Sequence, residues 1–592
     1  MTLDRSRPFV LLDDARQEGA AAARLYRDPL ETIAAEKRAE LADALAKLRG
    51  AAARGLHAAG YIAYDAGALG EADSPGEAEE GKPLFWFGLF DRFETIAPEE
   101  VPDLLPDPAG AWASPPAPRI GRDAYLDAFE RVKAYIAAGD IYQANLTFRA
   151  ECRTAGDPLA LYARLRGQAA AGWGGIVHDG ARTLLSFSPE MFVKLEGGRI
   201  EARPMKGTAA RRPESQADAE AARALAADPK QRAENLMIVD LIRNDLSRVA
   251  EPGSVAAPAL FTVETYPTIH QMTSTVTARL APGRDAAALL EAAFPCGSIT
   301  GAPKLRAMAV AAELEAGPRG PYTGSIGRID AKGGAAFNVA IRTLVIEEEG
   351  CAAIGLGSGI VADSDGAGEW RECLSKGGFI AAACRSLDLI ETMRFDPVEG
   401  IADLERHLAR MKASADALGF AFDRHAVRNE LQAATFRERR PARVRLRLAR
   451  SGRVAIELRP LPPPPSEPVT ARIAPLPVSP ADFRLAHKTG DRAFLDEARA
   501  ASGAFEVIFE RPDGLLTEGS FTSLFVEREG GLLVTPPLAR GLLPGVLRRR
   551  LLDESCAVEG DVRAADLRDG FLLGNALRGL IRAVAVSRDI GL

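Results

Sequence analysis

The sequence predicts a fold that mixes helices and strands, divided among several domain-sized units. With 592 residues, the chain is long enough for roughly three or four such units, each burying its own core. Alternating apolar residues in GDIYQANLTF (139–148) predict a strand, whereas apolar residues at helical spacing in AENLMIVDLIRNDLSRV (233–249) predict an amphipathic helix. The proline-rich stretch 97–120 predicts a linker or a long surface loop.

Composition and charge are those of a soluble globular protein and exclude two classes of partner. Apolar residues make up 47% of the chain and charged residues 26%. The net charge of −7 is spread along the sequence, so we expect neither a nucleic-acid-binding face nor a membrane-binding patch. No segment has the apolar core of a signal peptide or approaches the roughly 18 apolar residues of a membrane span, which predicts a cytoplasmic protein. The six cysteines lack CxxC spacing, so reduced core thiols are expected rather than disulfides or zinc ligands.

The first part of the chain, residues 1–120, is expected to form an N-terminal lobe with no chemistry that its residues reveal. It combines a strand-like start at 9–12, an alanine-rich helical stretch near 31–54 and the apolar run 84–87. A scaffold or regulatory lobe is the default interpretation.

The motif RPMKGT at 203–208 contains the first candidate catalytic residue. Pro204 presets φ, Gly207 lets the backbone approach a bound molecule closely, and Thr208 offers a hydroxyl to an anionic oxygen. Lys206, held in such a turn, could be a nucleophile. For these six residues alone, a surface turn with a solvated lysine is the alternative.

A carboxylate lies near this motif in the sequence. Glu190 follows the predicted strand 184–188 and precedes Lys206 by sixteen residues, which is enough for a hairpin that brings the two together. A solvated turn glutamate is the alternative.

Three further glutamates occur on predicted helices. Asp228 and Pro229 predict the start of a helix with Glu234 in its first turns, where a lone glutamate usually serves the helix dipole. Glu369 and Glu372 share a helix face with Lys376, and a surface ion pair there would be worth only a few tenths of a kcal/mol. Alternatively, Glu234 and Glu372 meet and hold a hard cation, for which Mg²⁺ is suited.

The glycine-rich segment FPCGSITGAPKLRAM at 294–308 predicts a tight loop followed by a helix. Backbone N–H groups at such a helix start form an anion site suited to a carboxylate, although the loop alone is a weak signal. Two later strands carry Tyr322 and Arg342, and a glycine-rich strand follows at 355–365.

These segments together resemble the chorismate-utilising enzymes over residues 121–385. The resemblance implies an α+β fold, a large β-sandwich with surrounding helices, with Mg²⁺ between its two sheets and chorismate as substrate. It is carried, in this order, by GDIYQANLT, SFSPE, RPMKGT, AENLMIVDLIRNDL, FPCGSITGAPK, PYTGSIG and FNVAIRT.

Two positions separate the branches of that family. Anthranilate synthases carry a small residue where Lys206 stands, whereas aminodeoxychorismate synthase component I carries a lysine. Isochorismate and salicylate synthases place a lysine base where this chain has Gln143. The resemblance therefore favours aminodeoxychorismate synthase, with anthranilate synthase component I fused to a PLP aminotransferase as the alternative.

The resemblance also implies a role for each residue. Lys206 would attack C2 of chorismate with a lowered pKa, and Glu190 would be the general acid for the departing C4 hydroxyl. Mg²⁺ would be bound by Glu234 and Glu372, with Glu369 joining through water. Substrate-binding positions are Tyr322 and Arg342 for the enolpyruvyl carboxylate, Gly357 and Gly359 for close backbone approach, and also Lys376, Thr300 and His270. For His270, a structural histidine is the alternative.

The second part, residues 388–592, resembles the fold-type IV pyridoxal phosphate (PLP) enzymes, which implies an α/β domain. The segments that carry this resemblance are RHLARM, HKTGDR, GLLTEGSFTSLFV, GLLPGVLRRRLL and GNALRGLIRA. Lys488 matches the Schiff-base lysine and Glu518 the partner of the pyridine nitrogen. Arg410 and the turn with Gly545 and Val546 match phosphate-binding positions.

The fusion itself points to one PLP reaction, that of aminodeoxychorismate lyase. Lys488 would remove the C4 proton, and loss of pyruvate would leave 4-aminobenzoate, as in the folate pathway. The GNAL segment around Asn575 resembles the lyase branch. The chain departs from the family in lacking the first strands before LIETMRF and in carrying Ser523 where asparagine is usual.

The sequence shows no glutamine-hydrolysing triad, because no Gly-x-Cys-x-Gly elbow is present. A separate glutamine amidotransferase subunit is therefore expected to supply ammonia. Fold-type IV enzymes usually place the PLP site near a dimer interface, so a homodimer through this domain is a further expectation. A non-catalytic chorismate-binding protein is an alternative of a different class.

Overall fold

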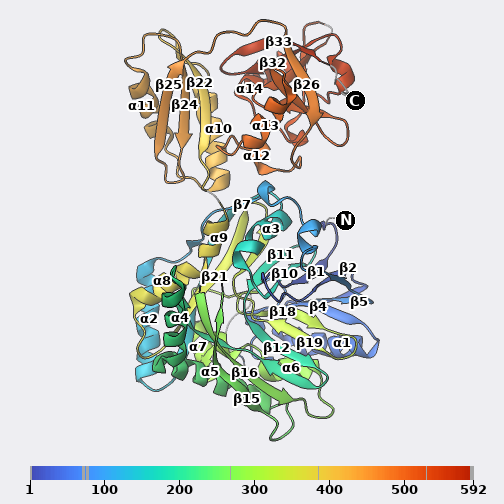
Figure 1. Ribbon diagram of the computed structural model, residues 1–592, viewed down its shortest axis with the longest axis vertical. Coiled ribbons are helices and arrows are strands. Elements are labelled where there is room, and N and C mark those ends of the chain that lie inside the picture. Colours follow the sequence, from blue (N-terminus) through green and yellow to red (C-terminus); the bar gives the residue numbers. More distant parts are fainter. Residues whose placement is uncertain are drawn as a thin grey trace. The chain divides into compact units, whose positions relative to one another are not determined.

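The computed structural model contains two compact units (Figure 1). The described residues are 3–69, 74, 79–266, 269–384, 386–528 and 530–586. The first unit comprises Met1–Pro106, Pro115–Cys152 and Tyr162–Ala383, and the second comprises Asp107–Ser114, Arg153–Leu161 and Cys384–Leu592. In the described ranges, no helix is long and apolar enough to cross a membrane.

Two sheets form the centre of the first unit. The first sheet has the order β17 (Gly301–Ala302), β9 (Gln143–Ala155), β21 (Cys351–Ile360), β20 (Thr343–Glu348), β11 (Thr183–Ser188), β10 (Trp173–His178), β1 (Phe9–Asp13), β2 (Ala23–Arg27) and β6 (Glu94–Ile96). The second has the order β14 (Met205–Ala210), β16 (Ile269–Arg279), β13 (Arg199–Ala202), β12 (Met191–Glu196), β19 (Ala335–Asn338), β18 (Ser325–Ile329), β4 (His57–Ile62), β5 (Phe85–Phe90) and β3 (Glu31–Ala35), with β15 (Ala256–Thr265) beside β16.

The two sheets pack against each other through apolar side chains. Val10 and Val177 of the first sheet share one core cluster with Tyr61 and Trp86 of the second. Helices α1 (Leu41–Ala53), α5 (Pro229–Ser247) and α6 (Ala286–Ala293) pack on the second sheet, and α2 (Arg122–Ala137) and α8 (Gly366–Lys376) pack beside β21. The remaining helices before residue 384 are α3 (Pro158–Ala169), α4 (Ser215–Ala227), α7 (Lys304–Leu314) and α9 (Gly378–Ala383). This confirms the predicted α+β sandwich with surrounding helices.

The strands between Phe9 and Ile96 belong to the two sheets of this sandwich. Strands β1, β2 and β6 complete the first sheet, and β3, β4 and β5 complete the second. The helix expected near 31–54 starts only at Leu41, because Glu31–Ala35 forms an edge strand against β5. In that strand exposed Glu31 and Thr32 precede buried Ile33, and β-branched residues fit a pleated, half-buried surface.

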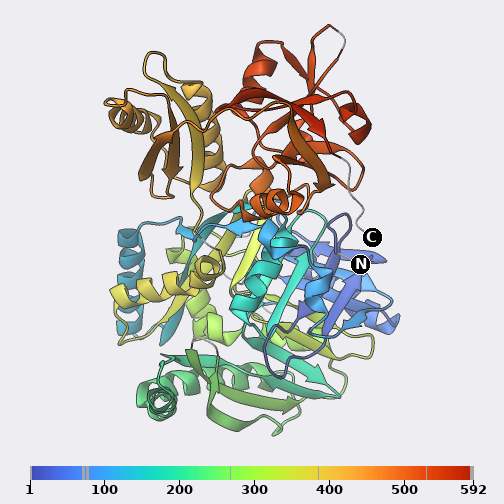
Figure 2. The same ribbon diagram turned by 45° about the horizontal axis from the view of Figure 1, so that its top comes forward.

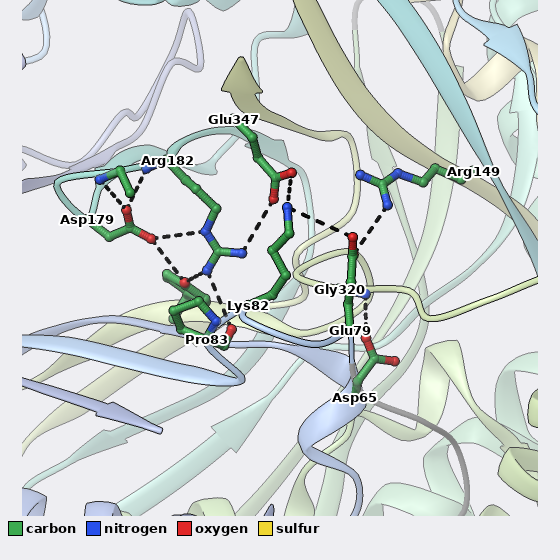
Figure 3. A network of polar contacts seen from close by, with 11 residues as sticks. Asp65, Glu79, Lys82, Pro83, Arg149, Asp179, Arg182, Gly320 and Glu347 are labelled. Carbon is green, nitrogen blue, oxygen red and sulfur yellow. Dashed lines mark hydrogen bonds and ion pairs between the residues drawn. The ribbon is translucent and has the colours of Figure 1, made fainter. Parts of the chain in front are cut away.

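A network of charged side chains joins the segment before β5 to the first sheet (Figure 3). Lys82 contacts both Glu79 and Glu347, and Arg149 of β9 donates to Glu79 over 3.4 Å. Arg182, which precedes β11, lies 3.7 Å from Glu347 of β20. Since these partners come from β9, β20 and the turn before β11, the network ties Glu79 and Lys82 to the first sheet.

The second unit contains two separate sheets, which Figure 2 shows in another orientation. The smaller has the order β23 (Gly400–Ile401), β22 (Leu389–Asp396), β24 (Ala442–Leu448) and β25 (Val454–Pro460). The larger has the order β28 (Leu516–Gly519), β27 (Glu506–Glu510), β26 (Val469–Pro475), β33 (Gly579–Ala585), β32 (Phe571–Asn575), β29 (Ser523–Glu527), β30 (Leu533–Thr535) and β31 (Ala557–Glu559).

Helices complete the second unit and give it the predicted α/β character. Strand β26 pairs in parallel with both β27 and β33, and α13 (Ala493–Ser502) packs on β26 and β27. Helix α10 (Leu404–Leu418) packs on β22 of the smaller sheet. The other helices are α11 (Arg424–Thr435), α12 (Phe483–Ala486) and α14 (Val546–Asp553).

Candidate active sites

A cavity of about 840 Å³ in the first unit collects most of the residues predicted for the first active site. Its walls come from β14, α5, α8, β21 and the turn before β12. Ten predicted residues line it: Glu190, Lys206, Glu234, Tyr322, Arg342, Gly357, Gly359, Glu369, Glu372 and Lys376.

Two glycines shape the surroundings of Lys206, one through the backbone of its strand and one through the space beside its amine. The pairing of β14 with β16 is irregular between Met205 and Thr208, and Gly207 lies in this bulge with a φ of +98°, which a side chain rarely allows. A Cβ atom added at Gly359 would lie 2.5 Å from the Nζ atom of Lys206. Gly359 therefore leaves the room that the lysine amine fills.

The surroundings of Lys206 favour its neutral form. Burial lowers the pKa of Lys206 below its ordinary value, and the nearby ammonium of Lys376 acts in the same direction. The carboxylates of Glu234, Glu372 and Glu369 oppose this lowering but do not cancel it. The direction of the shift is the one that nucleophilic attack requires.

Glu190 has the properties of a proton donor. It is only 4% exposed, and its Oε1 atom has no hydrogen-bond partner among the described residues. Burial raises the pKa of Glu190 to about 7, although a hydrogen bond from Ser298 and the charge of Lys206 lower it. A carboxyl group with this pKa is protonated in a substantial fraction of molecules at neutral pH.

The three carboxylates predicted to bind metal line the cavity, and two of them already have protein partners. Glu372 pairs with Lys376 over 2.8 Å, and Glu369 accepts a hydrogen bond of 2.7 Å from Ser364. Burial raises the pKa of Glu234, and the charges of Glu369 and Glu372 contribute to the increase. Over the described ranges, no three His, Cys, Asp or Glu side chains gather closely enough to form a metal-binding group. The oxygen ligands of Glu234, Glu369 and Glu372 suit Mg²⁺, which takes one or two carboxylates together with waters and substrate oxygens. Binding of Mg²⁺ at this site stays a prediction.

Arg342 and Tyr322 form the part of the wall suited to an anion. Arg342 lies on a turn with a φ of +50°, and its guanidinium has no carboxylate partner within the part of the chain that the structure describes. Burial lowers the pKa of Arg342 below its ordinary value. Lys376 donates to the carbonyl oxygen of Gly357 over 2.8 Å, which fixes the ammonium beside the glycine-rich strand.

Two predicted substrate contacts lie behind the cavity wall. The hydroxyl of Thr300 donates to the carbonyl oxygen of Cys296 over 3.3 Å, while the adjacent Ser298 and Ile299 line the cavity. His270 is buried, with Nε2 2.9 Å from Asp218 and Nδ1 3.1 Å from Thr265. The structure thus favours the structural alternative for His270, because both ring nitrogens already have protein partners.

Sequence reasoning missed a buried ion pair that shapes this cavity. Arg319 and Glu315 are 2.7 Å apart with side chains 3% and 6% exposed. The guanidinium of Arg319 also donates to the carbonyl oxygens of Asn145 (2.7 Å) and Ile299 (3.2 Å), and both residues line the cavity. An i,i+4 pair in a sequence resembles an ordinary surface pair, so no local signal separated it from one.

The second unit contains a cavity of about 550 Å³ lined by residues of both its sheets. Lys488, Glu518, Arg410, Gly545, Val546, Ser523 and Asn575, all singled out in the sequence, line it. The carbonyl oxygen of Lys488 accepts a hydrogen bond of 2.9 Å from Ile390 of β22. This bond anchors the lysine beside the smaller sheet.

Burial shifts the pKa values of two side chains in this cavity, Lys488 and Glu518, toward neutrality. Burial lowers the pKa of Lys488 to about 7, and the neighbouring Arg492 and Arg410 add to the shift. Burial also raises the pKa of Glu518 to about 7, although its Oε1 accepts a 2.8 Å hydrogen bond from the N–H of Leu543. A lysine and a carboxyl that both titrate near neutrality are suited to proton transfer.

The lining of the cavity also includes groups suited to a phosphate. Arg410 donates to Glu391 over 2.8 Å and to the carbonyl oxygen of Pro544 over 3.1 Å. Helix α14 begins at Val546, and a Cβ atom at Gly545 would lie 2.5 Å from the Oγ atom of Ser523. Lysine, carboxylate, arginine and a helix N-terminus in one cavity fit PLP.

Comparisons with known proteins match each part of the chain to a protein family. Residues 7–382 match the family described as chorismate binding enzyme, and residues 388–586 match Amino-transferase class IV. Aminodeoxychorismate synthase component 1 of Salmonella typhimurium is 45% identical over 282 residues, 47% of this chain and 60% of that protein. Anthranilate synthase component 1 of Streptomyces coelicolor is 42% identical over 264 residues, 44% of this chain and 51% of that protein.

A solved structure supports the fold of the first unit. Anthranilate synthase component I from Streptococcus pneumoniae has a TM-score of 0.52 at 25% identity, covering 62% of this chain and 93% of that chain. This chain spans about three fifths of the length of the curated aminodeoxychorismate synthase components it matches. The first family match covers more than half of the chain, and the second implies PLP. The chain therefore belongs to the chorismate binding enzyme family and carries an Amino-transferase class IV domain after it.

Proposed function

We propose that the chain makes 4-aminobenzoate from chorismate and ammonia in two successive reactions. The first unit replaces the C4 hydroxyl of chorismate with ammonia, releasing water and giving 4-amino-4-deoxychorismate. The second unit removes pyruvate from that compound. The observation that supports this proposal best is the placement of Lys206 and Glu190 in one cavity, with Gly359 leaving room for the lysine amine.

Lys206 is the nucleophile of the first reaction. Substitution at C4 is easier in two steps with a covalent adduct between them. The amine of Lys206 forms a bond to C2 as the C4–O bond breaks. Ammonia then forms a bond to C4 as the C2–N bond to Lys206 breaks, so no oxidant or reductant is needed. The lowered pKa of Lys206 increases the fraction of its amine that is neutral and able to attack.

Glu190 donates the proton that turns the departing hydroxyl into water. Its pKa of about 7 and its unpartnered Oε1 atom support this role. Tyr322 and Arg342 bind the enolpyruvyl carboxylate. Lys376 donates a hydrogen bond to the carbonyl oxygen of Gly357 and so contacts β21, the strand that contains Gly357. Mg²⁺ on Glu234 and Glu372, with Glu369 through water, would neutralise the ring carboxylate.

Lys488 moves the proton in the second reaction. PLP, when bound, supplies the electron sink for the carbon that loses its proton. Glu518 would hold the pyridine nitrogen, while Arg410 and the N–H groups of Gly545 and Val546 would hold the phosphate. Lys488, with a pKa of about 7, takes the C4 proton. Loss of pyruvate then leaves the aromatic ring of 4-aminobenzoate.

An anthranilate synthase component fused to a PLP aminotransferase is the second candidate. Relatives named anthranilate synthase support it, since one is 42% identical over 264 residues. Lys206 argues against it, because the resemblance places a small residue there in anthranilate synthases. We also propose that ammonia comes from a separate glutamine amidotransferase subunit, since no hydrolysing triad is visible in the sequence.

Two variants of the full chain test the proposal. With chorismate, Mg²⁺, PLP and ammonium, Lys206→Ala should give no aminodeoxychorismate and no 4-aminobenzoate. Lys488→Ala should convert chorismate but accumulate aminodeoxychorismate, and a mixture of the two variants should restore 4-aminobenzoate. Chromatography of the products shows which of these compounds each variant forms. Unchanged turnover of chorismate by Lys206→Ala would contradict the covalent role of this lysine. Formation of 4-aminobenzoate by Lys488→Ala alone would contradict the assignment of the second unit as the lyase.

A further inference from the structure

The β24 wall of the second cavity carries two arginines with no counter-ion. Arg443 and Arg445 both line the cavity with Lys488. Neither forms an ion pair with any residue that the structure describes, and the Nε atom of Arg443 is buried without a hydrogen-bond partner. Leaving a buried charged donor unpaired costs free energy, so an arrangement of this kind indicates a missing anionic partner.

The pairing of the strands emphasises this excess of positive charge. Arg443 lies directly opposite Arg394 of β22 on one side and Arg459 of β25 on the other. Like charges directly opposite one another destabilise a sheet. Arg445 lies opposite Glu457, but Glu457 forms its ion pair with Arg459 instead. The sheet therefore holds both arginines without neutralising them.

The other cations of the cavity are engaged by the protein. Arg410 pairs with Glu391, Arg492 donates to the carbonyl oxygen of Ser520 over 2.9 Å, and Arg578 donates to that of Pro463 over 3.1 Å. Arg499 lies 3.8 Å from Asp496. Arg443 and Arg445 differ from these arginines, because neither forms a hydrogen bond or an ion pair through its side chain with the residues that the structure describes.

We propose that Arg443 and Arg445 bind the two carboxylates of a dianionic amino substrate and select it over monocarboxylate amino compounds. The inference rests on the proposed function, whose intermediate carries a ring carboxylate, an enolpyruvyl carboxylate and one amine. Arginine is suited to this task because its planar guanidinium binds a carboxylate through two parallel hydrogen bonds. The backbone of Lys488 is hydrogen-bonded to β22, the strand next to β24, and Lys488 lines the same cavity as both arginines.

Two stable aromatic probes test the selection without turnover. 4-Amino-3-(carboxymethoxy)benzoate has an amine and two carboxylates, and 4-amino-3-methoxybenzoate lacks the second carboxylate. Calorimetric titration of the PLP-loaded full chain should show tighter binding of the dicarboxylate. Arg443→Gln and Arg445→Gln should each weaken that binding about tenfold, as expected for loss of a charge-assisted hydrogen bond. The double variant should bind both probes about equally.

Arg394→Gln is the matched control. Arg394 lies opposite Arg443 in the same sheet, is exposed and does not line the cavity, so its removal changes the charge equally. This variant should keep the preference for the dicarboxylate. Retention of the absorbance of bound PLP by every variant shows that the cavity is intact.

The outcomes separate this inference from the proposed function. If wild type releases pyruvate from aminodeoxychorismate and the two variants keep its KM and the probe preference, the arginine assignment is wrong while the function stands. If wild type releases no pyruvate, the proposed function fails. A dicarboxylate preference that disappears in the double variant supports the arginines in either case.

Discussion

The amine of Lys206 occupies space that exists only because residue 359 has no side chain. The Gly359→Ala methyl group would lie 2.5 Å from Nζ and displace it from its position in the cavity. We expect the ammonium-dependent formation of aminodeoxychorismate to fall about a hundredfold, because small misplacements of a reacting group have effects of this size. Rates with purified variant and wild type measure the effect.

Gly167→Ala is the control for this substitution. Gly167 lies within α3, and a Cβ atom there meets no atom within 4 Å. Its rate should equal that of wild type, and alanine should slightly stabilise the helix. Equal activity of Gly359→Ala and Gly167→Ala would contradict the position assigned to the lysine.

Glu190 should set the alkaline side of the pH profile of the first reaction. Its pKa of about 7 means that the proton-donating form is present below that pH and is lost as the pH rises through it. Lys206 acts in the opposite sense, since only its neutral amine attacks. We therefore expect kcat/KM for chorismate to be bell-shaped and to fall above about pH 7. Glu190→Gln should lower the rate roughly a hundredfold or more and remove the alkaline fall. Persistence of that fall in the variant would assign it to another group.

The Arg319–Glu315 pair connects separate elements around the first cavity. Arg319→Gln leaves a buried carboxylate without its partner, and breaking such pairs costs about 3–5 kcal/mol. We expect the free energy of unfolding, measured with urea, to fall by about this amount. The KM for chorismate should also rise, since the carbonyl oxygens of Asn145 and Ile299 lose their donor.

Arg131→Gln provides the comparison for this element. Arg131 pairs with Glu313, two residues from Glu315, but its side chain is 57% exposed. Exposed pairs contribute about 0–1 kcal/mol, so this variant should change neither stability nor KM appreciably. An equal loss of unfolding free energy in Arg319→Gln and Arg131→Gln would mean that burial does not make the Arg319–Glu315 pair stronger than the Arg131–Glu313 pair.

Elements with strong local signals could be predicted from the sequence. Helix α5 begins at Pro229 with the side chain of Asp228 accepting from the N–H of Gln231, as the Asp-Pro pair indicates. The helix expected near 31–54 begins only at Leu41, because Glu31–Ala35 pairs with β5. The β-branched Thr32 and Ile33 suit a strand, but the alanines that follow them extend the helical pattern, and no residue within the segment reveals its partner strand.

At the scale of the whole molecule, the resemblance to known families supplied the residues, and the short separation of Glu190 and Lys206 already predicted that these two meet. Glu372 follows Lys206 by more than 160 residues, and only the structure shows that it lines the same cavity. The charges of Arg443 and Arg445 have no local signature, because alternating arginines on a strand usually face solvent. Their significance appears only when the register and the other lining residues are known.

The dependence on a separate ammonia donor is a property of the whole chain. Purified protein should not hydrolyse glutamine, and glutamine should not replace ammonium in the first reaction unless an amidotransferase is added. Glutamate release, measured with and without that subunit, checks this expectation. Efficient glutamine hydrolysis by the chain alone would contradict it.

The most direct test of the account is to identify the aromatic product. Purified chain is incubated with chorismate, Mg²⁺, PLP and ammonium, and the products are separated by chromatography. The account predicts 4-aminobenzoate together with an equal amount of pyruvate. Anthranilate as the product would contradict the assignment of Lys206, and accumulation of aminodeoxychorismate would contradict the role of the second unit.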